Sequence, residues 1–309
     1  MPFPPDKSSV LFSLAAPYLI WTGFSVTVMA AGHFLPQAAG PTVGTVSVIG
    51  FLVVASALTS HFIVRAEPVF RNRPGLRKIS LLTAGCISAA LFFLSRQTGY
   101  VSDLTGILNT ANLLVLANLL GCWITAPLRR PAELIPLCLV MSLADLFSVA
   151  AGPTREIAKN IDQYYKSGMQ GPVPVTDFIL IKIVIPGQDS LMPVFGVADW
   201  IIVAFLSAAA LRFGMNDNLA GKGLGEMVRR NRLSFYLPIA VPGLFAASAL
   251  AWHLKIFLPA LPVIALFFLA YTAARYPKVR QLTPSDWKLM GATACVMISL
   301  MAARYCLLG

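Results

Sequence analysis

Two aspartates stand in the middle of long uncharged stretches of this sequence. Asp145 lies in VMSLADLFSVAAGPT and Asp199 in PVFGVADWIIVAF. A charged side chain at the centre of a membrane-spanning helix costs about 2.5–3.5 kcal/mol on insertion scales, and such residues usually mark a functional site. A hydrogen-bonding link between helices is the structural alternative. The two carboxylates are therefore the first candidates for chemistry.

Two carboxylates in contact within a low-dielectric site can act as an acid–base pair. They cannot both ionise, so one keeps its proton and the pair titrates as a unit. One carboxylate then activates water as a base, while the other protonates the carbonyl of a peptide bond. The same pair also suits a proton- or cation-coupled transporter, although the sequence shows no inverted repeat.

Motifs for other chemistries do not occur in the sequence. HExxH, a P-loop and GxGxxG are missing, and His33, His61 and His253 stand far apart. These histidines fit packing or interfacial positions better than a metal site. We therefore expect no metal and no cofactor.

The composition is typical of a polytopic membrane protein. Hydrophobic residues make up 57% of the chain and charged residues 12%, against about 45–50% and 25% in soluble domains. The net charge of +11 comes from short Arg and Lys clusters between apolar segments, as the positive-inside rule expects. This placement indicates a lipid bilayer, and no nucleic acid, as the partner of the basic residues.

Nine apolar stretches predict an all-α fold of about nine transmembrane helices. Basic clusters follow every even-numbered stretch, so the positive-inside rule places those loops and the N-terminus in the cytoplasm. We expect a multi-pass protein of the cell membrane, plasma or inner. The predicted spans are residues 9–34, 42–65, 79–97, 104–127, 131–151, 193–213, 233–254, 256–275 and 287–307.

One long loop, residues 152–192, joins the two aspartate spans and should lie outside. Asp145 lies about six residues before the end of its span, and Asp199 about six residues after the start of the next. At 1.5 Å per residue both carboxylates lie about 9 Å below the same membrane face, where they can meet. Within the loop, FILIKIVIP predicts a short β-strand. This strand either covers the helix ends or pairs through an exposed edge with an extended peptide.

A third motif, Pro259-Ala260-Leu261, opens the eighth predicted span at a depth close to both aspartates. Alone, a proline there indicates only the start of a helix. Together, LAD at 143–145, GVAD at 196–199 and PAL at 259–261 resemble the presenilin and signal peptide peptidase family of intramembrane aspartyl proteases. That family carries YD, GxGD and PAL in the same order, and the resemblance covers about residues 131–275.

The resemblance implies a role for each matching residue. Asp145 and Asp199 would be the catalytic pair, and Gly196 would give flexibility beside the second aspartate. The other candidates would shape the site and hold an unwound substrate strand; they are Pro259, Ala260 and Leu261 of PAL, with Ile181 and Ile183 of FILIKIVIP.

The resemblance also divides the chain and implies an activity. Residues 1–130 would be a helical scaffold, 131–275 the catalytic core and 276–309 a C-terminal transmembrane helix. The activity would be that of an endopeptidase that hydrolyses transmembrane segments or signal peptide remnants. With the loop between the aspartates outside, its substrates would have a cytoplasmic N-terminus, as type II anchors do. No obligatory partner subunit is evident.

Two residues depart from the family pattern. Ala144 replaces the tyrosine of YD, and Ala198 replaces the second glycine of GxGD. These changes leave an alternative, a catalytically inactive relative that binds membrane helices without cutting them. The aspartates also fall in the fifth and sixth predicted spans, whereas the family has them in the sixth and seventh.

Overall fold

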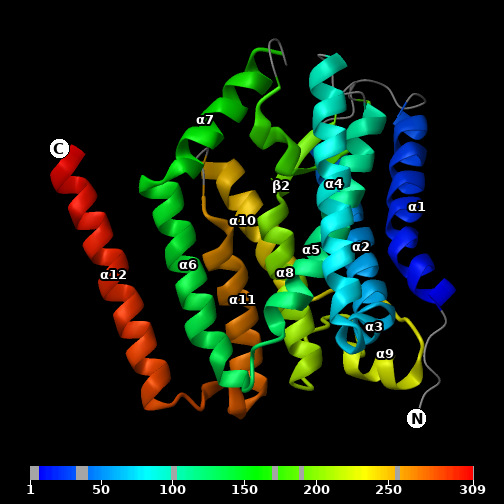
Figure 1. The fold of residues 1–309 in the computed structure, drawn as a ribbon. Helices are drawn as coiled ribbons and strands as arrows, with labels where there is room; N and C mark the ends of the chain where they lie inside the picture. The colour runs from blue at the N-terminus through cyan, green and yellow to red at the C-terminus, as the bar shows by residue number, and fades with distance from the viewer. Residues whose placement is uncertain are drawn as a thin grey trace.

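A computed structural model describes residues 7–32, 41–98, 103–168, 173–187, 191–254 and 258–308. Within these residues each predicted span contains a helix (Figure 1). The long helices are α1 (Lys7–Gly32), α2 (Pro41–Arg65), α4 (Pro74–Thr98), α5 (Asp103–Thr125), α6 (Leu134–Ala151), α8 (Val197–Arg212), α10 (Ala240–Leu254), α11 (Ala260–Arg275) and α12 (Pro284–Leu308). The shorter elements are α3 (Glu67–Asn72), η1 (Pro131–Glu133), α7 (Pro153–Lys166), η2 (Val175–Ile179), β1 (Leu180–Ile183), β2 (Met192–Gly196), α9 (Leu224–Arg230) and η3 (Pro277–Arg280).

Five helical segments in the described part of the chain are long and apolar enough to cross a bilayer. They lie in α1, across α2 and α3, in α4, in α5, and across η1 and α6. The helices α10 and α11 are apolar but shorter. The structure therefore supports a largely helical membrane protein, while the count of nine spans stays a prediction.

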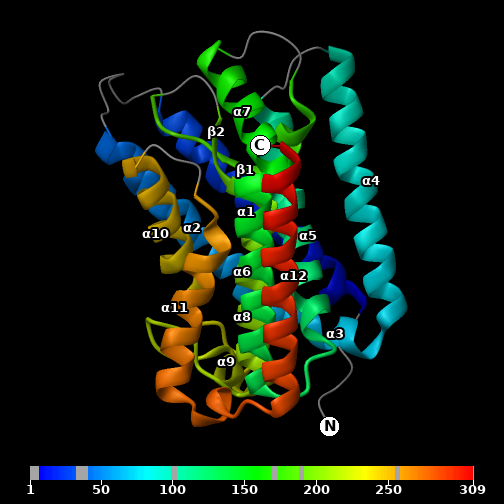
Figure 2. The same cartoon turned by 90° about the vertical axis from the view of Figure 1, so that its left-hand side faces the viewer.

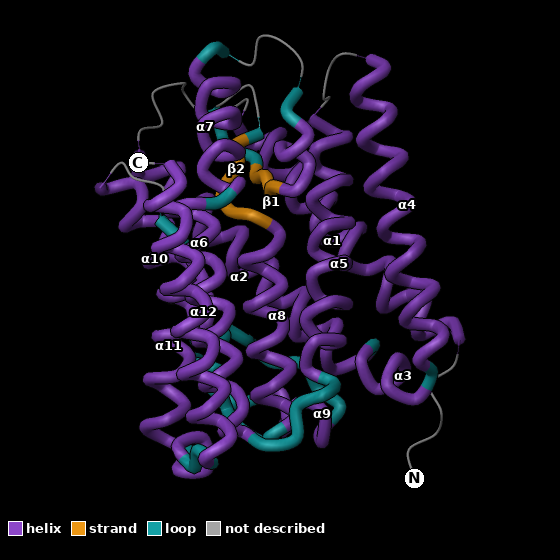
Figure 3. The backbone as a smooth tube through the Cα atoms, turned by 60° about the vertical axis from the view of Figure 1, so that its left-hand side comes forward, coloured by secondary structure: helices purple, strands orange, loops and turns teal. Residues whose placement is uncertain are grey.

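The long helices run side by side, with α5 and α8 in the middle of the bundle (Figures 1 and 2). Helices α1, α2 and α4 lie on one side of this pair, and α6, α10, α11 and α12 lie on the other. The strands, orange in Figure 3, lie near α7 at one end of the bundle. Short helices α3 and α9 lie at the opposite end of the bundle. We call it the basic end, because α3, α9 and the first two turns of α4 carry Arg71, Arg77, Lys78, Arg229 and Arg230.

The two central helices approach each other closely at Gly121 of α5. A methyl group on Gly121 would lie 2.6 Å from the backbone nitrogen of Phe205 and 2.8 Å from the backbone oxygen of Ile201, both on α8. Such distances are well inside van der Waals contact, so only glycine fits. Small residues at helix contacts are typical of membrane proteins, where close backbone packing replaces the hydrophobic effect as a source of association.

A buried chain of polar side chains ties the central pair to α2. The Thr59 hydroxyl donates a hydrogen bond to Asn118 Oδ1 at 2.9 Å and accepts one from Trp200 Nε1 at 3.2 Å. All three side chains are fully buried. Buried donors and acceptors that pair with each other avoid the cost of lost hydration, so this chain specifies how α2, α5 and α8 register against one another.

The segment between the aspartate helices agrees with the prediction in one respect and departs from it in two. Strand β1 confirms the predicted strand, and it pairs antiparallel with β2 around a bulge between Ile181 and Lys182. The sixth span was predicted to start as a helix at residue 193, which is wrong, because residues 192–196 are extended and pair with β1. The predicted loop also contains α7, an amphipathic helix that begins at Pro153.

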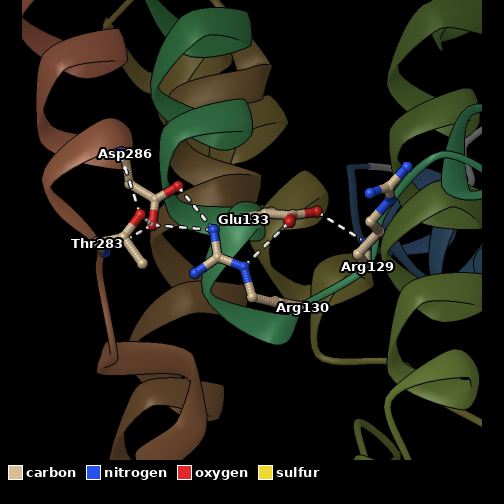
Figure 4. A network of polar contacts seen from close by, with 5 residues as sticks. All are labelled: Arg129, Arg130, Glu133, Thr283 and Asp286. Carbon is tan, nitrogen blue, oxygen red and sulfur yellow. Dashed lines mark hydrogen bonds and ion pairs between the residues drawn. The ribbon is translucent and has the colours of Figure 1, made fainter.

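Helix α12 is fastened to the start of α6 by an arginine shared between two carboxylates (Figure 4). Arg130 Nη2 lies 3.2 Å from Asp286 Oδ1, and its Nε lies 3.3 Å from Glu133 Oε1. Asp286 Oδ2 also accepts hydrogen bonds from the backbone nitrogen and the hydroxyl of Thr283, both at 2.7 Å. The Asp286 N–H in turn donates to Thr283 Oγ1 at 3.4 Å, so the two residues form a capping box at the start of α12.

The turn that follows α8 at the basic end is built on a buried aspartate. Asp217 is 1% exposed, and its Oδ2 accepts a hydrogen bond from the hydroxyl of the buried Tyr236 at 2.7 Å. Its backbone oxygen accepts from the backbone nitrogen of Ile239 at 2.9 Å. Burial raises the pKa of the Asp217 carboxyl from 3.8 to about 7.

We predict that Gly121→Ala destabilises the protein by about 2 kcal/mol, because overpacking a tight contact typically costs 1–3 kcal/mol. Thermal unfolding in detergent measures the change. Gly85→Ala is the matched control, since Gly85 is also helical and a methyl group there would meet nothing within 4 Å. Equal unfolding temperatures for the two variants would contradict the close α5–α8 contact.

We also predict that Asp217 makes the protein less stable as the pH rises from about 4 to 7. The unfolded carboxyl loses its proton near pH 4, whereas the folded one keeps it to about 7, so folding loses up to about 4 kcal/mol across this window. Asp217→Asn cannot ionise and still accepts the Tyr236 hydrogen bond. Its unfolding temperature should fall less with pH than that of the wild type; parallel curves would refute the assignment.

Candidate active site

Helix α6 positions the first aspartate close to the strand end of the bundle. Asp145 lies in the last two turns of α6 and its side chain is half-buried. Its Oδ2 accepts a hydrogen bond from the backbone nitrogen of Leu261 at 3.2 Å. A residue 116 positions further along the chain thus contacts this carboxylate directly.

The PAL motif explains why the Leu261 N–H is available to Asp145. Pro259 is the N-cap of α11, and the helix begins at Ala260. The first backbone N–H groups of a helix have no partner within the helix, and they lie at the positive end of its dipole. The Leu261 N–H belongs to this turn and is donated to Asp145. Residues 256 and 257 of the predicted span lie outside the described residues.

The second aspartate lies where strand β2 turns into helix α8. Asp199 is in the first turn of α8, half-buried, and its Oδ2 accepts a hydrogen bond from the backbone nitrogen of Gly196 at 3.0 Å. A side chain in the first turn that reaches back to the N-cap nitrogen is one half of a capping box. Asp199 is therefore oriented by the same turn that starts its helix.

The conformation around Asp199 does not require the glycine freedom of the GxGD pattern. Gly196 has φ −77° and ψ 153°, which any residue adopts. Ala198 lies within the regular first turn of α8, so it fits where the family has glycine. In this structure the contribution of Gly196 is its N–H group rather than flexibility.

The fold brings Asp145, Asp199 and Leu261 together from three separate motifs. Helix α11 packs against both α6 and α8. The two carboxylates lie within electrostatic reach of each other. Each is held by a backbone N–H at the N-terminal end of a different helix, α11 for Asp145 and α8 for Asp199. Such an arrangement can hold a proton between two acids and pass it to a bound group.

Ile181 and Ile183 lie in strand β1, which pairs with the strand that leads to Asp199. Their side chains are 0% and 2% exposed and pack in the core, and their role in holding a substrate stays a prediction. The backbone of β1 is also occupied on its far side, where Lys182 N–H donates to Thr110 Oγ1 at 3.2 Å. Strand β2 has no second partner strand in the described sheet.

Sequence reasoning missed the polar chain that fixes α8 behind the second aspartate. Trp200, the neighbour of Asp199, donates to Thr59, and Thr59 donates to Asn118. The signal was available as an asparagine within an otherwise apolar stretch, since a buried amide requires a hydrogen-bonding partner. Its partner in α2 was not predictable without the helix arrangement.

Comparisons with protein-family models, with curated proteins and with solved structures give no match to this chain. Among the described residues, no three His, Cys, Asp or Glu side chains gather in a way that could hold a metal ion. The resemblance to presenilin and signal peptide peptidase therefore rests on the three sequence motifs alone.

We predict that Gly196→Pro lowers the free energy of unfolding by about 2 kcal/mol, because it removes the N–H that Asp199 accepts. Proline fits the φ of Gly196, so the backbone itself is not strained. Gly196→Ala is the control: it keeps the N–H, and its methyl group would come no closer than 3.6 Å to Asp199 Oδ2. Chemical or thermal unfolding in detergent compares the two. A proline variant as stable as the alanine variant would show that this hydrogen bond contributes nothing.

Proposed function

We propose that the chain is an intramembrane aspartyl endopeptidase that hydrolyses peptide bonds in transmembrane segments or signal peptide remnants. The observation that carries the proposal is the hydrogen bond from Leu261 to Asp145, with Asp199 within electrostatic reach. It joins the PAL motif to the first aspartate, as a protease that uses all three motifs requires.

The chemistry uses the two carboxyl groups in opposite protonation states. The ionised carboxylate takes a proton from water as the water oxygen bonds to the carbonyl carbon, while the protonated one gives its proton to the carbonyl oxygen. As the C–N bond of the tetrahedral intermediate breaks, the newly protonated carboxyl gives its proton to the leaving amine. The other carboxylate takes a proton from a hydroxyl of the intermediate, which becomes the carboxylic acid product and restores the pair. Both aspartates are half-buried. No metal takes part in these steps.

An extended substrate would reach the dyad along strand β2. The far side of β1 is covered by α5, whereas β2 has no second strand among the described residues. A peptide added to β2 would gain main-chain hydrogen bonds, and β2 continues directly into the helix turn that carries Asp199. This route supplies the unwinding that cleavage of a transmembrane helix needs.

In the membrane, we place nine spans across the bilayer with the N-terminus in the cytoplasm, in the cell membrane. The basic end of the bundle supports this orientation, because Arg and Lys concentrate in cytoplasmic loops. The strands and the dyad then lie toward the outer face, at the opposite end of α6 and α8. Substrates with a cytoplasmic N-terminus, such as type II anchors, fit this arrangement, and we propose no partner subunit.

We predict that Asp145→Asn and Asp199→Asn each reduce cleavage of transmembrane peptides by at least about 1000-fold, since each removes one carboxyl of the pair. The purified protein in detergent is incubated with a panel of transmembrane peptides of both orientations. Mass spectrometry of the products measures cleavage. Asp217→Asn is the matched control, because it makes the same change in a buried aspartate at the basic end.

Cleavage that survives either active-site change would overturn the proposal. Cleavage by none of the proteins, with ion flux that depends on Asp145 and Asp199 in vesicles, would favour a coupled transporter. Capture of uncut peptides would identify an inactive relative.

A further inference from the structure

A large cavity lies at the basic end of the bundle, far from the aspartate pair. Its volume is about 1320 Å³, and it is bounded by residues of α2, α3, α4, α5, α8 and α9. Ligand pockets for small molecules typically span 300–1,000 Å³, so this one has room for a sizeable ligand. Neither the proposed chemistry nor its substrate uses this cavity.

The lining of the cavity is strongly cationic. It includes Arg71, Arg77, Lys78 and Arg212 against a single carboxylate, Glu67. Arg77 already neutralises Glu67, since its Nη2 lies 2.9 and 3.0 Å from the two carboxylate oxygens. Arg71, Lys78 and Arg212 are exposed. A cavity with this surplus of positive charge attracts an anion.

Much of the remaining lining is apolar, and part of it is exposed on the surface of the bundle. Leu82, in the third turn of α4, is 70% exposed, and Trp123, near the end of α5, is 55% exposed. Both lie near the ends of segments long and apolar enough to span a bilayer. Tryptophan is enriched at this level of a membrane, where its ring meets the headgroup region. Cationic and apolar surfaces thus meet in one cavity at an interface.

We propose that this cavity binds an anionic phospholipid. The phosphate lies among Arg71, Lys78 and Arg212, and an acyl chain runs along Leu82 and Trp123. Free phosphate would use only the cationic half of the site, whereas a lipid uses both halves. Basic pockets between transmembrane helices recognise anionic headgroups through this combination of charge and hydrocarbon contact.

The test titrates the full-length protein in detergent with phosphatidylglycerol and reads bound lipid by native mass spectrometry. The double variant Arg71→Gln with Lys78→Gln should weaken lipid binding roughly 30-fold, because the loss of each basic residue lowers the affinity about five-fold. Arg229→Gln with Arg232→Gln is the matched control, because both arginines are exposed at the same end and lie outside the cavity. This control should change affinity less than about 3-fold.

Three outcomes would overturn the proposal: equal weakening by both double variants, equal affinity for phosphatidylcholine, or displacement of the lipid by millimolar inorganic phosphate. The last would identify a free-phosphate site. Phosphatidylglycerol with a photoreactive acyl chain adds an independent readout, since its crosslinks should map to the peptides that contain Leu82 or Trp123. Crosslinks that map only elsewhere would also refute the site. Thermal unfolding in phosphatidylcholine-containing micelles verifies that each variant is folded.

Discussion

At Gly121 the backbone of α5 comes so close to α8 that one methyl group would not fit. Helix α8 carries Asp199 at its start, and Trp200 is anchored through Thr59 to α2 and α5. The depth and rotation of α8, and hence the place of the second carboxylate, follow from this central contact. Helices α6 and α11 then meet α8 from the other side and supply the partners of the site.

Both aspartates of the candidate site are oriented by backbone groups rather than by side chains. Gly196 N–H holds Asp199, and Leu261 N–H holds Asp145. A backbone donor in the first turn of a helix has no rotamers to lose, and its direction is set by the helix itself. The site is therefore as rigid as the packing of α6, α8 and α11. This explains how PAL, which carries no reactive side chain, belongs beside two acids.

The sequence was sufficient for the helices and for the grouping of the motifs, but not for the details that connect them. Apolar run length predicts where helices lie, and antiparallel connection predicts that Asp145 and Asp199 share a depth. The start of α8 was misjudged because a short apolar run is equally compatible with a strand and a helix. The resemblance places Ile181 and Ile183 beside a substrate, and the sequence alone does not reveal that both side chains are buried in the core. The Leu261 N–H carries no sequence signal beyond the proline before it.

Gly196 takes part in two interactions: it pairs with Leu180 at the end of the small sheet, and its N–H donates a hydrogen bond to Asp199. The register of this sheet, whose strands have four and five residues, thereby influences the position of the Asp199 carboxylate. A shift of one residue in the pairing of β1 with β2 would present a different peptide group to α8. The register of the sheet therefore determines which backbone N–H orients the Asp199 carboxylate. The bulge between Ile181 and Lys182 accommodates one unpaired residue, and the pairing between this bulge and Gly196 is regular.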